Sequence, residues 1–145
     1  MSAAEVAPIT VLGENESWSL LSSVTLGRLG TSVDGQPDIF PVNFVVVRRE
    51  IIIRTAEGTK LAETVLNHRV AFEADEHGLE NAWSVVVKGW AEVLTSAADI
   101  AAADRAQVLP WTATVKQRYL RITPAEITGR RFVFGTEPEY GCGLG

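Results

Sequence analysis

The chain has 145 residues, which is the size of one ordinary domain and too short for two independent hydrophobic cores. Its 13 lysines and arginines are outnumbered by 18 aspartates and glutamates, so a net charge of -5 argues against a nucleic-acid partner. The single Cys142 has no internal disulfide partner, and neither His68 nor His77 stands at metal-ligand spacing. With no apolar window long enough for a membrane span and no secretory pattern at the N-terminus, we expect a soluble, cytoplasmic protein without a metal.

The first half of the chain predicts one short helix and two β-hairpins. Trp18 and two leucines among polar neighbours indicate an amphipathic helix over Glu14–Ser23. Leu26–Val33 and Ile39–Val47 have strand composition, and the Asp-Gly turn between them predicts a hairpin. Ile51–Thr55 resumes the β pattern after a short polar connection, which predicts the second hairpin.

The second half predicts two more helices among further strands. The expected elements are a helix over Gly58–Asn67, a strand over Arg69–Asp75, a polar loop over Glu76–Ala82, a strand over Trp83–Leu94, a helix over Ser96–Gln107 with Ser96 as its N-cap, and one or two closing strands over Val115–Thr123 and Glu126–Phe134. The strand after the loop carries bulky residues on both faces, as expected for a barrel strand inside a dimer. This order predicts an α+β domain whose antiparallel sheet closes into a small β-barrel.

The turn after the fourth predicted strand offers groups that suit a phosphate. Arg54 and Lys60 are cations, Thr55 and Thr59 are hydroxyl donors, and Gly58 lets the backbone approach a ligand closely. The glycine patterns of phosphate-binding loops and dinucleotide folds are absent. From the residues alone, the favoured interpretation is that a helix begins here and the cations are solvated surface charges.

Two other positions interrupt apolar strands. Pro41 removes a ladder donor and Asn43 places an amide in an apolar series, where it could bind the polar edge of a flat heterocycle or be satisfied by nearby backbone. Trp83 and Ser84 open the long strand in a similar way, with Trp83 as either a core residue or a stacking platform.

Several pieces in order resemble a known family, the flavin-binding split-barrel proteins related to pyridoxamine 5'-phosphate oxidase. The resemblance runs from about Leu26 to Arg131 and is carried by Gly27-Arg28-Leu29-Gly30, Asp34-Gly35-Gln36-Pro37, Pro41-Val42-Asn43-Phe44, Arg54-Thr55-Ala56-Glu57-Gly58-Thr59-Lys60-Leu61, Val70-Ala71-Phe72-Glu73 and Trp83-Ser84-Val85-Val86-Val87-Lys88-Gly89-Trp90-Ala91-Glu92. It implies that residues 1–145 form a single flavin-binding domain, a six-stranded antiparallel split β-barrel that works as a homodimer with two flavin sites at the interface.

The resemblance also implies roles for individual residues. In that family the positions of Thr55, Gly58, Thr59 and Lys60 bind the flavin phosphate, the strand of Pro41, Val42 and Asn43 lies along the ring, and Ser84 is a polar contact to the ring or ribityl chain. Two departures stand out: the chain stops soon after Arg130-Arg131-Phe132, without the segment that carries substrate-binding residues in the vitamin-metabolising oxidase, and Leu61 replaces one of its paired cations. The first argues against pyridoxamine phosphate as substrate, and the second weakens the phosphate grip.

The leading functional hypothesis is an FMN-dependent oxidoreductase that passes hydride to an unidentified small molecule, since a flavin supplies the reactive atom and no catalytic side chain is needed. One alternative is a deazaflavin-dependent reductase, whose acidic cofactor tail would need a basic groove; the candidates are Arg28, Arg48, Arg49, Lys116, Arg118 and Arg121. The other is a non-catalytic carrier or sensor. It would bind a flavin and not a haem, because a haem requires an axial ligand that neither histidine is placed to supply. Trp83, Trp90 and the valines between them indicate a homodimer surface, or simply a monomer core.

Overall fold

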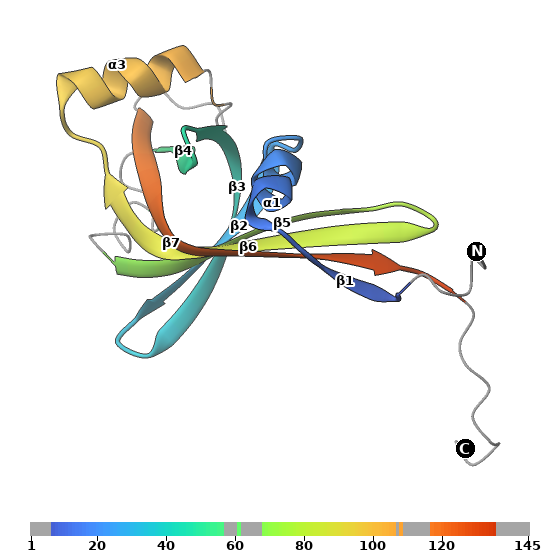
Figure 1. Ribbon diagram of the computed structural model, residues 1–145. Coiled ribbons are helices and arrows are strands. Elements are labelled where there is room, and N and C mark those ends of the chain that lie inside the picture. Colours follow the sequence, from blue (N-terminus) through green and yellow to red (C-terminus); the bar gives the residue numbers. More distant parts are fainter. Residues whose placement is uncertain (1–6, 57–60, 62–67, 107, 109–116, 136–145) are drawn as a thin grey trace.

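The computed structural model describes residues 7–56, 61, 68–106, 108 and 117–135, in which a curved sheet carries two helices (Figure 1). The described elements are β1 (Ile9–Leu12), α1 (Glu14–Leu21), β2 (Leu26–Val33), β3 (Gln36–Val47), β4 (Glu50–Ala56), β5 (His68–His77), β6 (Asn81–Val93), α3 (Ala97–Ala106) and β7 (Gln117–Val133). No helix among these residues is long and apolar enough to cross a membrane.

All strand pairings in the described sheet are antiparallel, in the order β1-β7-β4-β3-β2-β5-β6. A further pairing between β7 and β6 closes the sheet into a barrel, because the long β7 pairs with β4 from Gln117 to Ile122 and with β6 along most of its length. The predicted α+β split barrel is therefore confirmed. The six predicted strands correspond to β2 through β7, and the short β1, which was not predicted, is added at the end of β7.

Three expectations need comment. Of the one or two closing strands predicted around Pro124, the structure has one continuous strand, because Pro124 lies at a β-bulge opposite Gly89, where a missing N–H is tolerated. The loop predicted over Glu76–Ala82 is shorter, because β5 and β6 continue as a hairpin to His77 and from Asn81. Of the helix predicted over Gly58–Asn67, only Leu61 lies within the described residues.

The helices lie where the prediction placed them and cover different parts of the sheet. Trp18 and Leu21 of α1 are buried against the barrel core, whose centre includes an edge-to-face pair of Phe44 and Phe72 with ring centroids 4.7 Å apart. The α3 helix covers a second, smaller apolar cluster at one end of the barrel (Figure 1). Ser96 caps that helix by accepting a hydrogen bond at 3.1 Å from the backbone N–H of Asp99, as predicted.

Candidate functional site

Side chains alternate across the sheet between the core under α1 and the opposite side, which we call the open face. The core side carries the buried residues of each strand, such as Leu29, Val42, Phe72 and Val85. Across β3, β2, β5, β6 and β7, the open face consists of Pro41, Asn43, Leu26, Arg28, Glu73, Asp75, Ser84, Val86, Thr128 and Arg130. No element of the described chain covers this face as α1 covers the other, so it is available to a ligand or a partner.

One row of residues runs straight across the open face. Arg28 is paired in register with Pro41 on one side and Glu73 on the other, and Glu73 is paired with Val86. The Nη1 atom of Arg28 donates to Oε1 of Glu73 at 2.9 Å and to Oδ2 of Asp75 at 3.2 Å. One guanidinium nitrogen therefore serves two carboxyl groups, directly beside the strand predicted to lie along the flavin ring.

The charge balance of this cluster changes the acidity of Glu73. Burial of its carboxyl group raises its pKa to about 7, and the hydrogen bond and negative charge of Asp75 act in the same direction, while Arg28 lowers it. The Glu73 side chain keeps 29% of its exposure and that of Asp75 keeps 41%, so the cluster is accessible from the open face.

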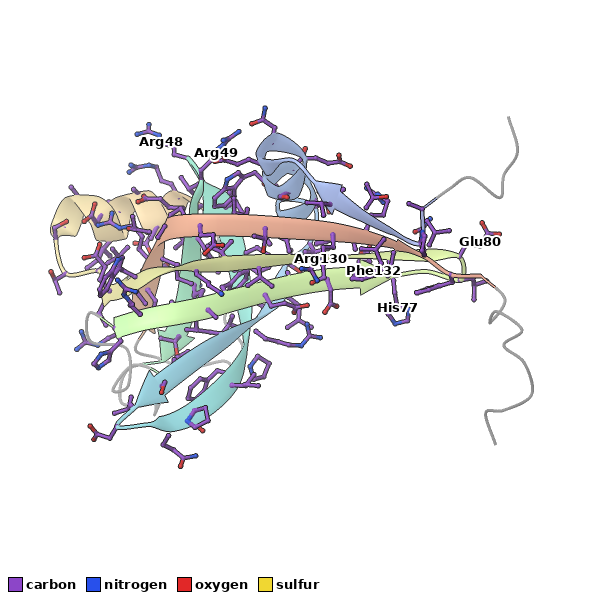
Figure 2. The ribbon with its side chains drawn as sticks, turned by 60° about the horizontal axis from the view of Figure 1, so that its bottom comes forward. Arg48, Arg49, His77, Glu80, Arg130 and Phe132 are labelled. Atoms are coloured by element: carbon purple, nitrogen blue, oxygen red, sulfur yellow. The ribbon has the colours of Figure 1, made fainter. Side chains whose placement is uncertain are left out.

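The predicted polar contacts Asn43 and Ser84 lie on the same open face. Asn43 is half-buried and pairs with Leu26, while Ser84 is half-buried between Asp75 and Arg130. Figure 2 shows Arg130 and Phe132 on β7, with His77 nearby in the β5–β6 hairpin. The strands that carry Asn43 and Ser84, β3 and β6, are three strand spacings apart, or about 14 Å along the sheet. The side chains of Asn43 and Ser84 in one chain are therefore too far apart to bind the same atom of a ligand.

Two of the residues predicted to bind the phosphate, Arg54 and Thr55, lie on opposite faces of β4. Thr55 is on the same side of β4 as the buried Ile53 and is paired in register with Arg118. Arg54 points the other way, toward α3, where its guanidinium carbon lies 6.0 Å from the centroid of the Tyr119 ring and its Nη1 donates to the backbone carbonyl of Val108 at 3.4 Å. Arg54 and Thr55 therefore do not approach one ligand atom together through their side chains.

The remaining predicted site residues divide into two groups. Val42, Leu61 and Trp83 have exposed fractions of 2%, 6% and 6% and belong to the core, so their side chains do not reach the open face. Among them, Val42 can still present its backbone beside Pro41 and Asn43. Gly58, Thr59 and Lys60 lie outside the described residues, and their role stays a prediction.

Sequence analysis did not assign Glu73 and Asp75 to the site, and it named Arg28 only as a candidate for the basic groove of a deazaflavin. Two carboxylates separated by one residue in a strand must share a face, and this signal was readable. The pairing with Arg28 depends on β2 lying between β3 and β5, which the sequence order does not reveal. In the described part of the chain, no group of three histidine, cysteine, aspartate or glutamate residues could hold a metal ion.

Comparisons with known proteins match the fold and this region of the chain. The chain is 53% identical over 95 residues to an uncharacterised protein of Mycobacterium tuberculosis, covering 66% of this chain and 86% of that protein. It is 50% identical to the FAD binding protein from Mycobacterium smegmatis, with a TM-score of 0.77 over 85% of this chain and 99% of that structure. A candidate pyridoxamine 5'-phosphate oxidase from Corynebacterium glutamicum is 48% identical, with a TM-score of 0.84 over 91% of this chain and 98% of that structure.

The family assignment rests on a match that covers most of the chain. Residues 13–131 match the pyridoxamine 5'-phosphate oxidase family, a range that begins just before α1 and ends near the end of β7. The matched range includes β2 through β6, nearly all of β7 and every residue named above on the open face. The chain therefore belongs to the pyridoxamine 5'-phosphate oxidase family.

Proposed function

We propose that this protein binds a flavin on the open face and uses it as an oxidoreductase, passing hydride to a small molecule. The observation that carries the proposal is that Pro41, Asn43 and Ser84, which the family resemblance expects at the flavin, share one face with the paired Arg28 and Glu73. A relative that is 50% identical over nearly its whole length is an FAD binding protein, which supports a flavin as the ligand.

The described residues suit a flavin chemically. The ring presents carbonyl acceptors and N–H donors along one edge, which the Asn43 amide and the Ser84 hydroxyl can satisfy, while Leu26 and Val86 offer apolar contact. Thr55 and its register partner Arg118 lie on the core side of the sheet with Ile53, so they would bind a phosphate only at the ends of β4 and β7, beyond the edge of the open face. When bound, the flavin supplies the hydride chemistry, and the chain provides binding, orientation and charge.

FAD and FMN are the first cofactors to test, and the deazaflavin is the alternative. A deazaflavin tail needs free cations, but in the structure Arg28 is paired with Glu73 and Asp75, Arg121 with Glu92 and Asp99, and Arg49 with Glu14. These ion pairs leave less basic surface for an acidic tail than the sequence suggested. FAD is included because the similar protein from Mycobacterium smegmatis is an FAD binding protein.

The test is a titration of purified protein with FAD, FMN and a deazaflavin, followed by absorbance and flavin fluorescence. We expect binding of at least one flavin with a perturbed absorption band, and a loss of about tenfold in affinity for Asn43→Ala and for Ser84→Ala, equivalent to ~1.4 kcal/mol. Ser19→Ala is the matched control, because Ser19 is an exposed hydroxyl of α1, on the other side of the sheet. Failure of all three cofactors to bind would refute the proposal.

Turnover separates an enzyme from a flavin carrier. Stopped-flow mixing of the flavin-loaded protein with NADH or NADPH, followed by candidate acceptors, should bleach and then restore the flavin absorbance. A protein that binds flavin tightly but is neither reduced by the nucleotides nor reoxidised by any acceptor faster than free flavin would be a carrier or sensor.

A homodimer remains part of the proposal, but its apolar surface differs from the expected one. Trp83 is buried within the chain, whereas Trp90 is 47% exposed and Ile39 is 74% exposed, both on the open-face side of their strands. Leu26, 42% exposed, lies on the same face. We propose that a second copy of the chain covers these residues, and sedimentation or light scattering at low micromolar concentration should find a dimer; a monomer under those conditions would contradict it.

A further inference from the structure

Two carboxyl groups on the open face share one hydrogen-bond donor. Glu73 and Asp75 both accept from the same Nη1 atom of Arg28, at 2.9 and 3.2 Å, so their carboxyl groups are held near each other. Two ionised carboxylates in contact repel each other, so such a pair retains one proton to higher pH than isolated carboxylates do. Arg28 offsets only one of the two negative charges.

On β5 itself, the other charged or titratable residues that share this face are Arg69 and His77, near the two ends of the strand. From β2 the pair faces Arg28, and from β3 the next residue in the row is Pro41, which carries no charge. From β6 the opposite residues are Val86 and Ser84, with Lys88 one position further along the face; from β7 the nearest charged residues are Arg130, paired with Ser84, and Glu126, paired with Lys88. Burial of Glu73 is the largest cause of its raised pKa, which lies at about 7.

The position of the pair relates it to the proposed ligand. Arg28 connects Glu73 to Pro41 in one row, and Asp75 is opposite Ser84 in the next. The pair is therefore one strand away from Ser84 and two strands away from Pro41. Whichever part of the face the flavin occupies, a change in its charge acts on the pair through a short distance at a partly desolvated surface.

We propose that Glu73 and Asp75 form a proton-exchanging pair that takes up a proton from solvent when flavin on this face receives an electron pair, and releases it on reoxidation. This inference rests on the proposed function. The electron pair comes from a hydride donor, or from dithionite in the test, and the proton forms an O–H bond on a carboxylate oxygen of the pair. The added negative charge on the face is thereby offset by one proton.

The first test measures the reduction potential of flavin-loaded protein between pH 5.5 and 8.5, by dithionite titration against a reference dye. Each proton taken up with an electron pair contributes about 30 mV per pH unit to the slope. We expect a steeper slope around pH 7 in wild type than in Glu73→Gln or Asp75→Asn. Glu76→Gln is the control, because Glu76 is on the same strand but on its other side, and its slope should match wild type.

The second test uses the protein without flavin, so it does not depend on the cofactor. Carbon-13 NMR of labelled glutamate carboxyl groups should show Glu73 titrating near pH 7 in wild type and at lower pH in Asp75→Asn. A Glu73 carboxyl that titrates below pH 5 in wild type would overturn the proton-exchanging pair. So would equal potential slopes in wild type and both variants, whereas a protein that binds no flavin would refute the proposed function as well.

Discussion

Replacing Gly89 with alanine should test how tightly β6 and β7 are held together at the bulge. A Cβ atom at this position would lie 2.1 Å from the backbone oxygen of Thr123 and 3.0 Å from the Cα of Pro124. Both are backbone atoms of the paired strand, so no side chain can rotate away and the two strands must separate. The close approach of the strands explains why glycine is required here.

The cost can be estimated from general values. Overpacking in a well-packed region costs about 1 to 3 kcal/mol, and an alanine in a strand regains about 0.5 to 1 kcal/mol of the conformational entropy that glycine loses on folding. Because the contact is about 1 Å closer than ordinary van der Waals distance and lies between backbones, we expect the upper part of that range, a net loss of ~2 kcal/mol. For a domain of this size the melting temperature should fall by roughly 4 to 8 °C.

Urea unfolding followed by tryptophan fluorescence measures this loss directly. Gly30→Ala is the matched control, since Gly30 is also in a strand, and its added Cβ would meet the backbone oxygen of Ala71 at 3.4 Å and the Cβ of Ala71 at 3.9 Å, both ordinary contact distances. That variant should stay within about 0.5 kcal/mol of wild type. A Gly89→Ala protein as stable as Gly30→Ala would refute the steric argument.

Three further predictions concern the protonation of Glu73, the smaller apolar cluster and the barrel core. Because the pKa of Glu73 is raised in the folded protein, its stabilising contribution is complete below about pH 4.5 and is lost as the pH rises to about 7. The free energy of unfolding of wild type should therefore be about 1 to 2 kcal/mol lower at pH 8 than at pH 5, and Glu73→Gln should remove this difference. An equal difference in wild type and variant would contradict the prediction. Tyr119→Phe removes the hydrogen bond that the hydroxyl donates to Asp104 at 2.5 Å. It should lower the free energy of unfolding by about 1 kcal/mol and speed amide hydrogen exchange in α3. Unchanged exchange in α3 would show that this bond does not hold the helix. Phe72→Ala, at a fully buried position, should cost about 3 to 5 kcal/mol in the same unfolding assay, and a loss under 1 kcal/mol would mean that the core refills.

The two hairpin turns illustrate what the sequence can and cannot predict. Asp34 and Gly35 adopt φ values of 51° and 80°, the left-handed turn that an Asp-Gly pair favours, and the hairpin was predicted from those two residues. Arg48 and Arg49 also adopt positive φ values, 51° and 58°, although arginine has no local preference for them. Their turn is imposed by the pairing of the flanking strands β3 and β4, whose last pair is Val47 with Glu50.

The same distinction applies to the candidate site. Alternation along β4 separates Arg54 from Thr55, and this could be read from the sequence because neighbouring residues in a strand point to opposite faces. The cluster of Arg28, Glu73 and Asp75 depends instead on which strands are neighbours. The strand β5 follows β4 in sequence but pairs with β2, so the contact joins residues 45 and 47 positions apart. No local pattern specifies such a contact.

The open face has to satisfy conflicting requirements in the proposed dimer. Its margins carry exposed apolar residues, Ile39 and Trp90, which favour burial against a second copy, but its centre carries two carboxyl groups and one guanidinium, which are costly to bury with a net negative charge. A proton on the Glu73 and Asp75 pair neutralises that excess. Cofactor, proton and second copy would then act on the same few side chains. For any two of them, the first should change the binding free energy of the second by the same amount as the second changes that of the first.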